Sequence, residues 1–198
     1  MSDVELRRPW RELTPLADWL VLTLSTACDK VVIAGSYRRE SEAVGDLEVV
    51  LLPKWEMSTP EVDLFGDPLT EPEPCYPQLD AVLKSCIDHC ELMPYRVDGK
   101  LIKAFTCGPM MPFDFEGQKI DMFIAKPDNF GNILLIRTGP ADYSKRLVTA
   151  QSYGGMMPFG FRQEGGYLYN GFTKIPCPTE ADFYAAIGKS FVHPRDRR

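Results

Sequence analysis

The sequence predicts an α+β protein of two lobes, and three features of the chain support this. Some segments repeat apolar residues at helical spacing, and others form short apolar runs typical of strands. The 198 residues, 44% hydrophobic and 25% charged, suffice for a sizeable core. Residues 137–198 carry nine Lys or Arg against five Asp or Glu, whereas residues 1–136 carry thirteen against twenty-three. We therefore place a lobe boundary near Asp128, between residues 1–127 and 128–198.

The first lobe is predicted to hold a mixed sheet backed by two helices. Thr14 and Pro15 are typical of a helix start, and helical spacing of apolar residues continues to about Cys28. A second helix is expected at residues 79–91, where apolar residues again share one face. Short apolar or β-branched runs predict strands at residues 30–34, 47–52, 101–107, 110–115 and 119–125.

Residues 56–78 differ in composition from the rest of the first lobe. They contain five prolines and six acidic residues but no Lys or Arg. Such a segment is typical of a long, exposed and irregular insertion. A solvated insertion is the favoured interpretation, and a protein-docking segment is the alternative.

The second lobe is predicted to be small, with helices and one hairpin. Two short helices are expected at residues 130–137 and 141–151, and Gly165-Gly166 suits the turn of a hairpin. Thr179 is the expected N-cap of a last helix over residues 180–187, with Asp182 completing a capping box.

Residues 34–51 carry the strongest functional pattern. A strand leads into Gly35, where the backbone can approach a ligand closely because no Cβ intervenes. Ser36 offers a hydroxyl, and Arg39 offers a planar set of donors suited to phosphate oxygens. Asp46 and Glu48 lie two residues apart on the next strand, so both carboxylates should share one face.

A third acid extends this pair. Asp121 lies within the apolar strand at residues 119–125, where a lone carboxylate would be unfavourable without a partner. If this strand lies beside the one that carries Asp46 and Glu48, three carboxylates meet. Two Mg²⁺ ions would relieve their repulsion, and this arrangement is typical of two-metal phosphoryl transfer.

The stretch from Gly35 to Val49 resembles the signature of the family X DNA polymerases, within the nucleotidyltransferase superfamily. The signature reads Gly-Ser-aromatic-Arg-Arg, five residues, then Gly-Asp-x-acid. The strand at Lys119–Asp121 resembles the family's third catalytic strand. Thr138-Gly139 with Lys145-Arg146, and the last helix with the basic segment 193–197, resemble parts of its thumb. The resemblance covers roughly residues 31–198, which is most of the chain, and implies a nucleotidyltransferase palm followed by a thumb.

The resemblance also implies a role for each matching residue. Asp46, Glu48 and Asp121 would be the catalytic residues and would hold two Mg²⁺ ions, for which Mn²⁺ can substitute. Asp121 would also be the base for the primer 3′-hydroxyl. The implied nucleotide-binding residues are Gly35, Ser36, Arg39, Gly45, Thr138 and Gly139. The implied DNA-binding residues are Lys119, Lys145 and Arg146.

Several positions depart from the family pattern. Glu48 and Lys119 stand where the family usually has Asp and Arg, and Ile136-Arg137 replaces a Tyr-Phe pair that excludes ribonucleotides. No helix-hairpin-helix pattern precedes residue 30, so we expect only a palm and a thumb, as in the compact viral members. Arg38 is expected to be a structural ion-pair partner rather than a ligand contact.

The expected activity is transfer of a nucleotide from a nucleoside triphosphate, with a deoxynucleotide favoured, to a nucleic-acid 3′-hydroxyl. Template-directed gap filling in DNA repair is the first hypothesis. Template-independent transfer to a nucleic-acid end or a small molecule is the second, and a non-catalytic nucleotide-binding module is the third. An extension assay separates the first two.

Charge and cysteine content define the expected partners and location. The net charge of −6 and pI near 5.0 disfavour a tight grip on duplex DNA, so we expect weak, salt-sensitive binding of primer-template or gapped DNA. Six cysteines without CxxC pairs favour an intracellular, reduced protein. No segment is typical of a signal peptide or a membrane span, and a monomer is expected.

Overall fold

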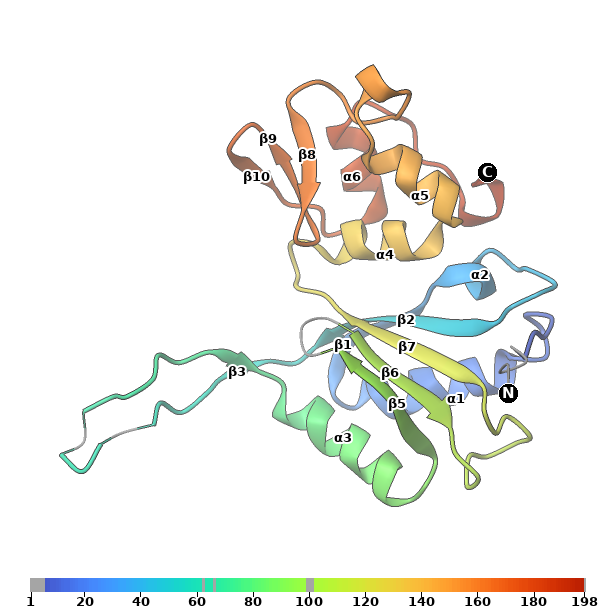
Figure 1. Cartoon of the computed structure of the whole chain (residues 1–198), viewed down its shortest axis with the longest axis vertical. Coiled ribbons are helices and arrows are strands. Elements are labelled where there is room, and N and C mark those ends of the chain that lie inside the picture. Colours follow the sequence, from blue (N-terminus) through green and yellow to red (C-terminus); the bar gives the residue numbers. More distant parts are fainter. Residues whose placement is uncertain (1–5, 62, 66, 99–101, 198) are drawn as a thin grey trace.

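Two sets of secondary-structure elements follow one another along the chain in the computed structural model, which describes residues 6–61, 63–65, 67–98 and 102–197 (Figure 1). Residues 1–5 and Arg198, at the ends of the two predicted lobes, lie outside the described residues, as does Leu101 of a predicted strand. The first set is α1 (Thr14–Ser25), β1 (Cys28–Ile33), α2 (Gly35–Arg38), β2 (Asp46–Pro53), β3 (Glu56–Met57), β4 (Pro74–Cys75), α3 (Pro77–Asp88), β5 (Leu92–Asp98), β6 (Ile102–Cys107) and β7 (Lys119–Ile124).

The main sheet has five strands in the order β1-β2-β7-β6-β5. Every pair of neighbours is antiparallel except β2 and β7, which run parallel, so the predicted mixed sheet is confirmed. A parallel pair needs a long connection, and the whole chain between β2 and β7 supplies it. The register of this pair places Glu48 opposite Asp121 and Asp46 opposite Lys119.

Alternation along β2 and β7 divides their side chains between two faces of the sheet. Leu47, Val49 and Met122 point into the main core, which α1 and α3 cover, as the sequence predicted. Val50 and Phe123 point to the opposite face, where they pack with the apolar side of the helix at residues 130–138. The even-numbered residues at the beginning of β2 share this second face, beyond the end of that helix.

The second set of elements forms its own small core over the second face of the sheet (Figure 1). Leu135, Leu168 and Phe183 are at the centre of this core, which is separate from the main one. The elements are α4 (Phe130–Thr138), α5 (Ala141–Val148), η1 (Gln151–Tyr153), β8 (Phe161–Glu164), β9 (Tyr167–Asn170), β10 (Thr173–Ile175), α6 (Glu180–Ala186) and η2 (Pro194–Asp196). The predicted capping box of α6, between Thr179 and Asp182, is confirmed.

A buried carboxylate joins the two sets of elements. Glu180, at the start of α6, is 5% exposed and accepts two hydrogen bonds from Arg38 of α2, at 2.8 and 2.7 Å. Its Oε1 lies 2.9 Å from Nη2 of Arg197, which is 3% exposed. Arg38 also donates to the Thr138 hydroxyl at 2.7 Å. We call Arg38, Glu180 and Arg197 the latch. The expectation that Arg38 is a structural ion-pair partner is therefore confirmed.

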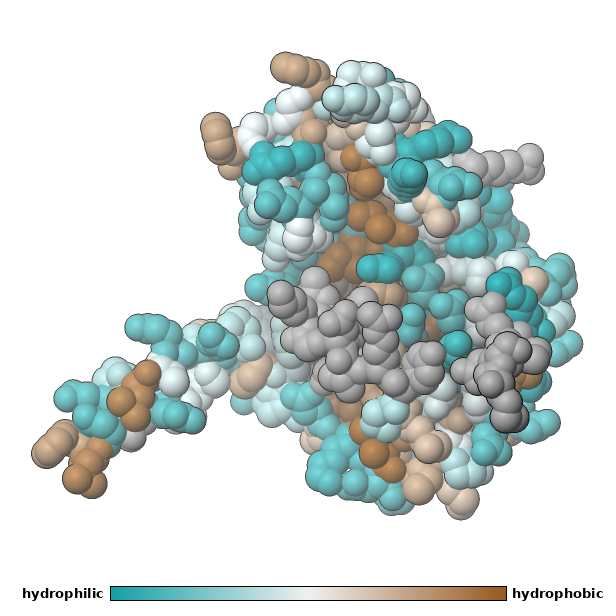
Figure 2. Space-filling model, in the orientation of Figure 1, coloured by the Kyte–Doolittle hydropathy of each residue, from teal (hydrophilic) through white to brown (hydrophobic). Residues whose placement is uncertain are grey.

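Residues 56–75 form an arm that projects from the side of the main sheet (Figure 1). Most of the described residues between β3 and β4 are exposed and lack regular secondary structure, as the composition predicts, but backbone hydrogen bonds join the two sides of the arm as in a hairpin. β3 pairs with β4, and the Asp63 carboxylate accepts from the amides of Phe65 and Asp67 at 2.8 and 2.9 Å. Leu64 and Phe65 are 93% and 86% exposed, so the far end of this acidic arm is apolar (Figure 2).

One strand prediction for the first lobe was wrong, and one strand of the main sheet was missed. Residues 110–115 form turns and bends instead of a strand, because Phe113 has a left-handed backbone with φ of 73°. Met111 and Phe115 are nevertheless buried in the main core. The edge strand β5 was not predicted. In the described part of the chain, no helix is both long enough and apolar enough to cross a membrane.

Candidate functional site

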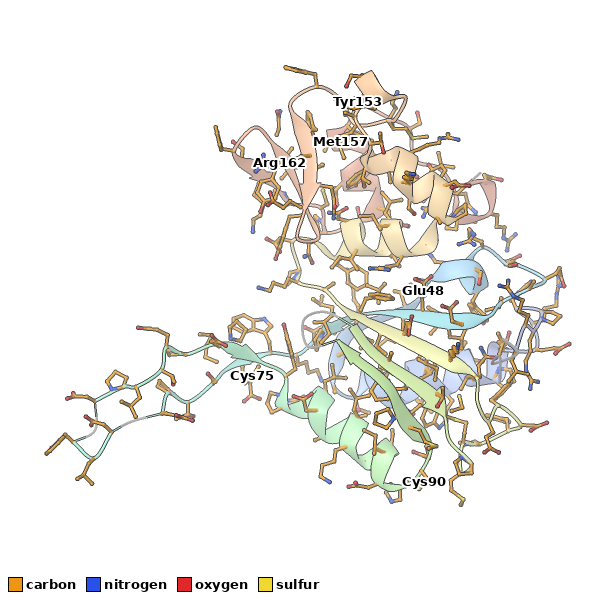
Figure 3. The ribbon with its side chains drawn as sticks, in the orientation of Figure 1. Glu48, Cys75, Cys90, Tyr153, Met157 and Arg162 are labelled. Atoms are coloured by element: carbon orange, nitrogen blue, oxygen red, sulfur yellow. The ribbon has the colours of Figure 1, made fainter. Side chains whose placement is uncertain are left out.

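Three carboxylates share the second face of the sheet, next to the end of α4. Asp46 and Glu48 alternate with buried residues along β2, and Asp121 lies opposite Glu48 on β7. Figure 3 shows Glu48 on β2, on the side of the sheet that faces α2 and α4. All three side chains are partly exposed. The structure therefore places the predicted catalytic residues on neighbouring strands and on one face.

The turn into α2 approaches these acids closely. Gly35 has φ of +60°, and a Cβ there would collide with the Glu48 carboxylate, so only glycine suits this position. The amide of Ala34 donates to the Glu48 carbonyl at 2.7 Å, which fixes the turn against β2. Ser36 and Arg39 are thereby held beside Asp46 and Glu48.

An open cleft of about 360 Å³ lies above Glu48 and Asp46. Five of its lining residues were predicted as site residues: Ser36, Arg39, Asp46, Glu48 and Gly139. Its opposite wall is the end of α4 and the start of α5, which contribute Ile136, Arg137, Pro140, Ala141 and Ser144. The cleft therefore brings hydroxyl and guanidinium donors together with carboxylates, and it lies between the two sets of elements.

The charges in the cleft influence one another. Burial raises the pKa of Glu48 to about 7, and Asp46 and Asp121 add to the rise, whereas Arg137 and Arg39 oppose it. Burial lowers the pKa of Arg39, against the opposite effect of the Glu48 and Asp46 carboxylates. Burial is therefore the main reason that the pKa of Glu48 is raised, and repulsion from the neighbouring acids adds to it.

Arg137 is a site residue that the sequence pattern did not identify. Its guanidinium lies 3.9 Å from the centre of the Phe123 ring, on the same face as Glu48. It is the foremost cation opposing the rise in the Glu48 pKa. Its position just before Thr138-Gly139 was the available signal, because that dipeptide was already part of the motif.

Other predicted nucleotide-binding residues support the site instead of lining it. Thr138 is fully buried, and its hydroxyl and carbonyl accept from Arg38 and Arg39 at 2.7 and 2.6 Å. Gly45 is also buried, and its carbonyl accepts from Gln118 at 2.7 Å. Thr138 and Gly45 therefore position the arginines and the start of β2.

The predicted DNA-binding residues lie in two places. Lys119 begins β7 and is paired in register with Asp46. Lys145 and Arg146 are exposed on α5, the helix whose first residues line the cleft. None of these three residues is among those that line the cleft.

The donor set suits a hard divalent cation by its chemistry. Carboxylate oxygens are the ligands that Mg²⁺ prefers, and a bound cation would oppose both the burial and the repulsion that raise the pKa of Glu48. As the side chains are placed, the described residues contain no group of three or more His, Cys, Asp or Glu that could hold a metal ion. Cation binding would therefore require the three carboxylates to rotate toward one another.

Replacing Gly35 by Ala should destabilise the protein and displace the Glu48 carboxylate. An alanine at this position would have to keep the left-handed backbone, which L-residues disfavour. Its Cβ would also collide with the Glu48 side chain. Gly165→Ala is the matched control, because Gly165 has φ of +57° and open space around it. We expect the free energy of unfolding, measured with urea, to fall by about 1–2 kcal/mol more for Gly35→Ala than for Gly165→Ala. Equal losses of stability in the two variants would contradict the close contact between Gly35 and the Glu48 carboxylate.

The raised pKa of Glu48 predicts a pH-dependent stability in the absence of metal. In the folded protein Glu48 keeps its proton up to about pH 7, whereas in the unfolded chain it loses the proton near its ordinary pKa. The protonated side chain therefore contributes its full stability below the unfolded pKa, and this contribution is lost as the pH rises through the folded pKa. Glu48→Gln should therefore be more stable than the wild type at pH 8, by on the order of 2 kcal/mol, but not at pH 4. Urea unfolding in EDTA measures this, with Glu164→Gln at an exposed site as control. If the stability of Glu48→Gln changed with pH in the same way as that of the wild type, the raised pKa of Glu48 would be excluded.

No protein-family model matches the sequence, and no curated protein matches it.

Proposed function

We propose that the protein is a metal-dependent nucleotidyltransferase of the family X polymerase type, which transfers a nucleotide from a nucleoside triphosphate to a nucleic-acid 3′-hydroxyl. One observation carries this proposal. A single cleft brings Ser36 and Arg39 together with Asp46 and Glu48, and Asp121 lies opposite Glu48 on the adjacent strand. Donors for phosphate and acids for metal-assisted transfer are thus on one surface.

Each group has a role that follows from its position. Arg39 and Ser36 would bind the outer phosphates of the nucleotide, and the Thr138 carbonyl holds the Arg39 guanidinium in place. Asp121 would accept the proton of the attacking hydroxyl, which arrives between β2 and the start of α5. The alignment of hydroxyl and phosphate, rather than covalent chemistry by the protein, would supply most of the rate enhancement.

Asp46, Glu48 and Asp121 would hold the divalent cations. Bound Mg²⁺ would supply charge neutralisation for the triphosphate and a lower pKa for the attacking hydroxyl. The neighbouring Arg137 would then face phosphate oxygens instead of Glu48 alone. In this proposal, the first set of elements would be the palm and the second set would be the thumb.

Template-directed gap filling is the first candidate reaction, and template-independent transfer is the second. The acidic character of residues 1–136 favours the second, because a charged surface of this sign binds duplex DNA weakly. The cationic α5 favours the first, since Lys145 and Arg146 are exposed on the helix whose first residues line the cleft.

A primer-extension experiment tests the proposal. A labelled primer is incubated with Mg²⁺ and with dNTPs or NTPs, on a gapped template, on a mismatched template and without template. We expect Mg²⁺-dependent addition of the complementary nucleotide to the gapped substrate, and none in EDTA. Addition without regard to template would assign the second reaction. Lack of any incorporation would contradict nucleotidyl transfer to nucleic acid.

A further inference from the structure

A second hollow lies at the opposite end of β2 and β7 from the acids. It has a volume of about 220 Å³, and its walls include Trp55 and Tyr76 at the base of the arm, with Lys126 and Asp128 after β7. Trp55 is 54% exposed. Most of the other lining residues are proline, alanine or leucine. The hollow is therefore an apolar, aromatic-walled site with a cation at its edge.

Strands β8, β9 and β10 form a second, three-stranded sheet, and the outer face of this sheet continues the surface of the hollow. Tyr167 and Tyr169 share one face of β9, because Leu168 between them points into the core. In the register of the sheet, Tyr169 lies between Arg162 of β8 and Lys174 of β10. Figure 3 shows Arg162 on the side of the molecule that bears β9 and β10. Two tyrosines thus alternate with two cations on this face.

Contacts through Asp128 connect the hollow to this face. Asp128 lines the hollow and accepts a hydrogen bond from Lys174 at 2.6 Å, and Lys174 Nζ lies 4.5 Å from the centre of the Tyr167 ring. Arg162 similarly lies 4.6 Å from the centre of the Tyr169 ring. Burial raises the pKa of Tyr167, and the Asp128 carboxylate adds to the rise. We call this continuous surface the aromatic cleft.

We propose that the aromatic cleft binds single-stranded nucleic acid, with unpaired bases stacked on Trp55 and Tyr167 and phosphates beside Lys126, Lys174 and Arg162. Aromatic side chains with cations beside them can stack on the face of any unpaired base. In a duplex the bases are already stacked on one another and are not accessible. Lys174 and Arg162 are each already paired with one carboxylate, Asp128 and Glu164. Stacking rather than net charge should therefore provide most of the affinity.

The position of the aromatic cleft relates it to the candidate active site. Glu48 and Pro53 are at the two ends of the same strand, about 16 Å apart at the usual rise per residue. A single strand held at Trp55 could therefore extend along the molecule toward the acids. This inference rests on the proposed function, because that function supplies the reason for nucleic acid to be present.

The test measures binding of a fluorescently labelled oligothymidylate of about twelve nucleotides by anisotropy. It is done in EDTA and without nucleotide, so it gives a result whether or not the protein extends primers. Trp55→Leu and Tyr167→Leu should each weaken binding about tenfold, since one stacked base contributes on that order. Phe65→Leu, at the exposed end of the arm, is the matched control and should leave binding unchanged.

Two further readouts separate stacking from general attraction. The oligonucleotide should quench tryptophan fluorescence in the wild type and not in Trp55→Leu. Raising the salt concentration from about 50 to 200 mM should weaken binding less than tenfold, far less than for a phosphate-driven site. Thermal unfolding checks that each variant is folded. If Tyr167→Leu does not fold, the binding measured for Trp55→Leu alone decides the outcome.

Three results would overturn the proposal. Trp55→Leu could bind the oligonucleotide as tightly as the wild type does, or Phe65→Leu could weaken binding equally. A lysine-rich peptide could quench Trp55 where the oligonucleotide does not, which would assign the aromatic cleft to a protein partner.

Discussion

Asp121→Asn is expected to reduce nucleotidyl transfer by at least about 10³-fold while leaving the protein folded. The substitution keeps the shape of the side chain but removes a carboxylate that would hold metal and accept the proton of the hydroxyl. It also removes one of the charges that raise the pKa of Glu48, so Glu48 should ionise at lower pH. Single-turnover incorporation at saturating Mg²⁺ measures the loss.

Asp114→Asn is the matched control for this experiment. Asp114 is exposed in the loop before β7, and the same change of charge there should leave the rate unaltered. If Asp121→Asn retained the wild-type rate and Mg²⁺-dependent triphosphate binding, the three-acid site would be wrong. If the wild type bound triphosphate but never transferred it, the chain would be a nucleotide-binding module.

Glu180→Ala is expected to lower the free energy of unfolding by about 3–5 kcal/mol, because it leaves two arginines of the latch without their shared partner. Arg197 is 3% exposed, so its charge would remain buried and uncompensated. Arg38 would lose two hydrogen bonds and retain only the one to the Thr138 hydroxyl. Urea unfolding followed by circular dichroism measures this loss.

Two further variants test whether the buried charge of Arg197 causes the loss of stability in Glu180→Ala. Glu164→Ala removes an exposed ion pair with Arg162 and should cost less than about 1 kcal/mol. Arg38→Leu should cost less than Glu180→Ala, since Glu180 keeps its contact with Arg197. A cost for Glu180→Ala as small as that for Glu164→Ala would show that the latch is not a major source of stability.

Most of the fold follows from local patterns, and the exceptions have physical causes. β5 contains Pro94, which argues against a strand, yet β5 is at the edge of the sheet, where a missing amide is tolerated. The pairing of β5 is irregular at that proline. Residues 110–115 alternate like a strand, but they bury Met111 and Phe115 from turns. Both outcomes depend on tertiary position, which no local window contains.

The candidate site was predictable where it depends on periodicity. The spacing of Asp46 and Glu48 fixes their common face, and Gly35 signals a close backbone approach. The pairing of Asp121 with Glu48 depends on which strands become neighbours, and the sequence supplied this only through a resemblance. The buried role of Thr138 was not predictable, because it depends on contacts with Arg38 and Arg39 from the other set of elements.

The parallel pairing of β2 with β7 has a consequence for how the protein folds. Glu48 and Asp121 are opposite each other, yet 73 residues separate them along the chain. Closing so long a loop carries an entropic cost that must be met before the two strands gain any contact. Local hairpins such as β8 with β9 can form early, whereas the acids can meet only late. We therefore expect folding intermediates to be compact but devoid of the three-acid surface.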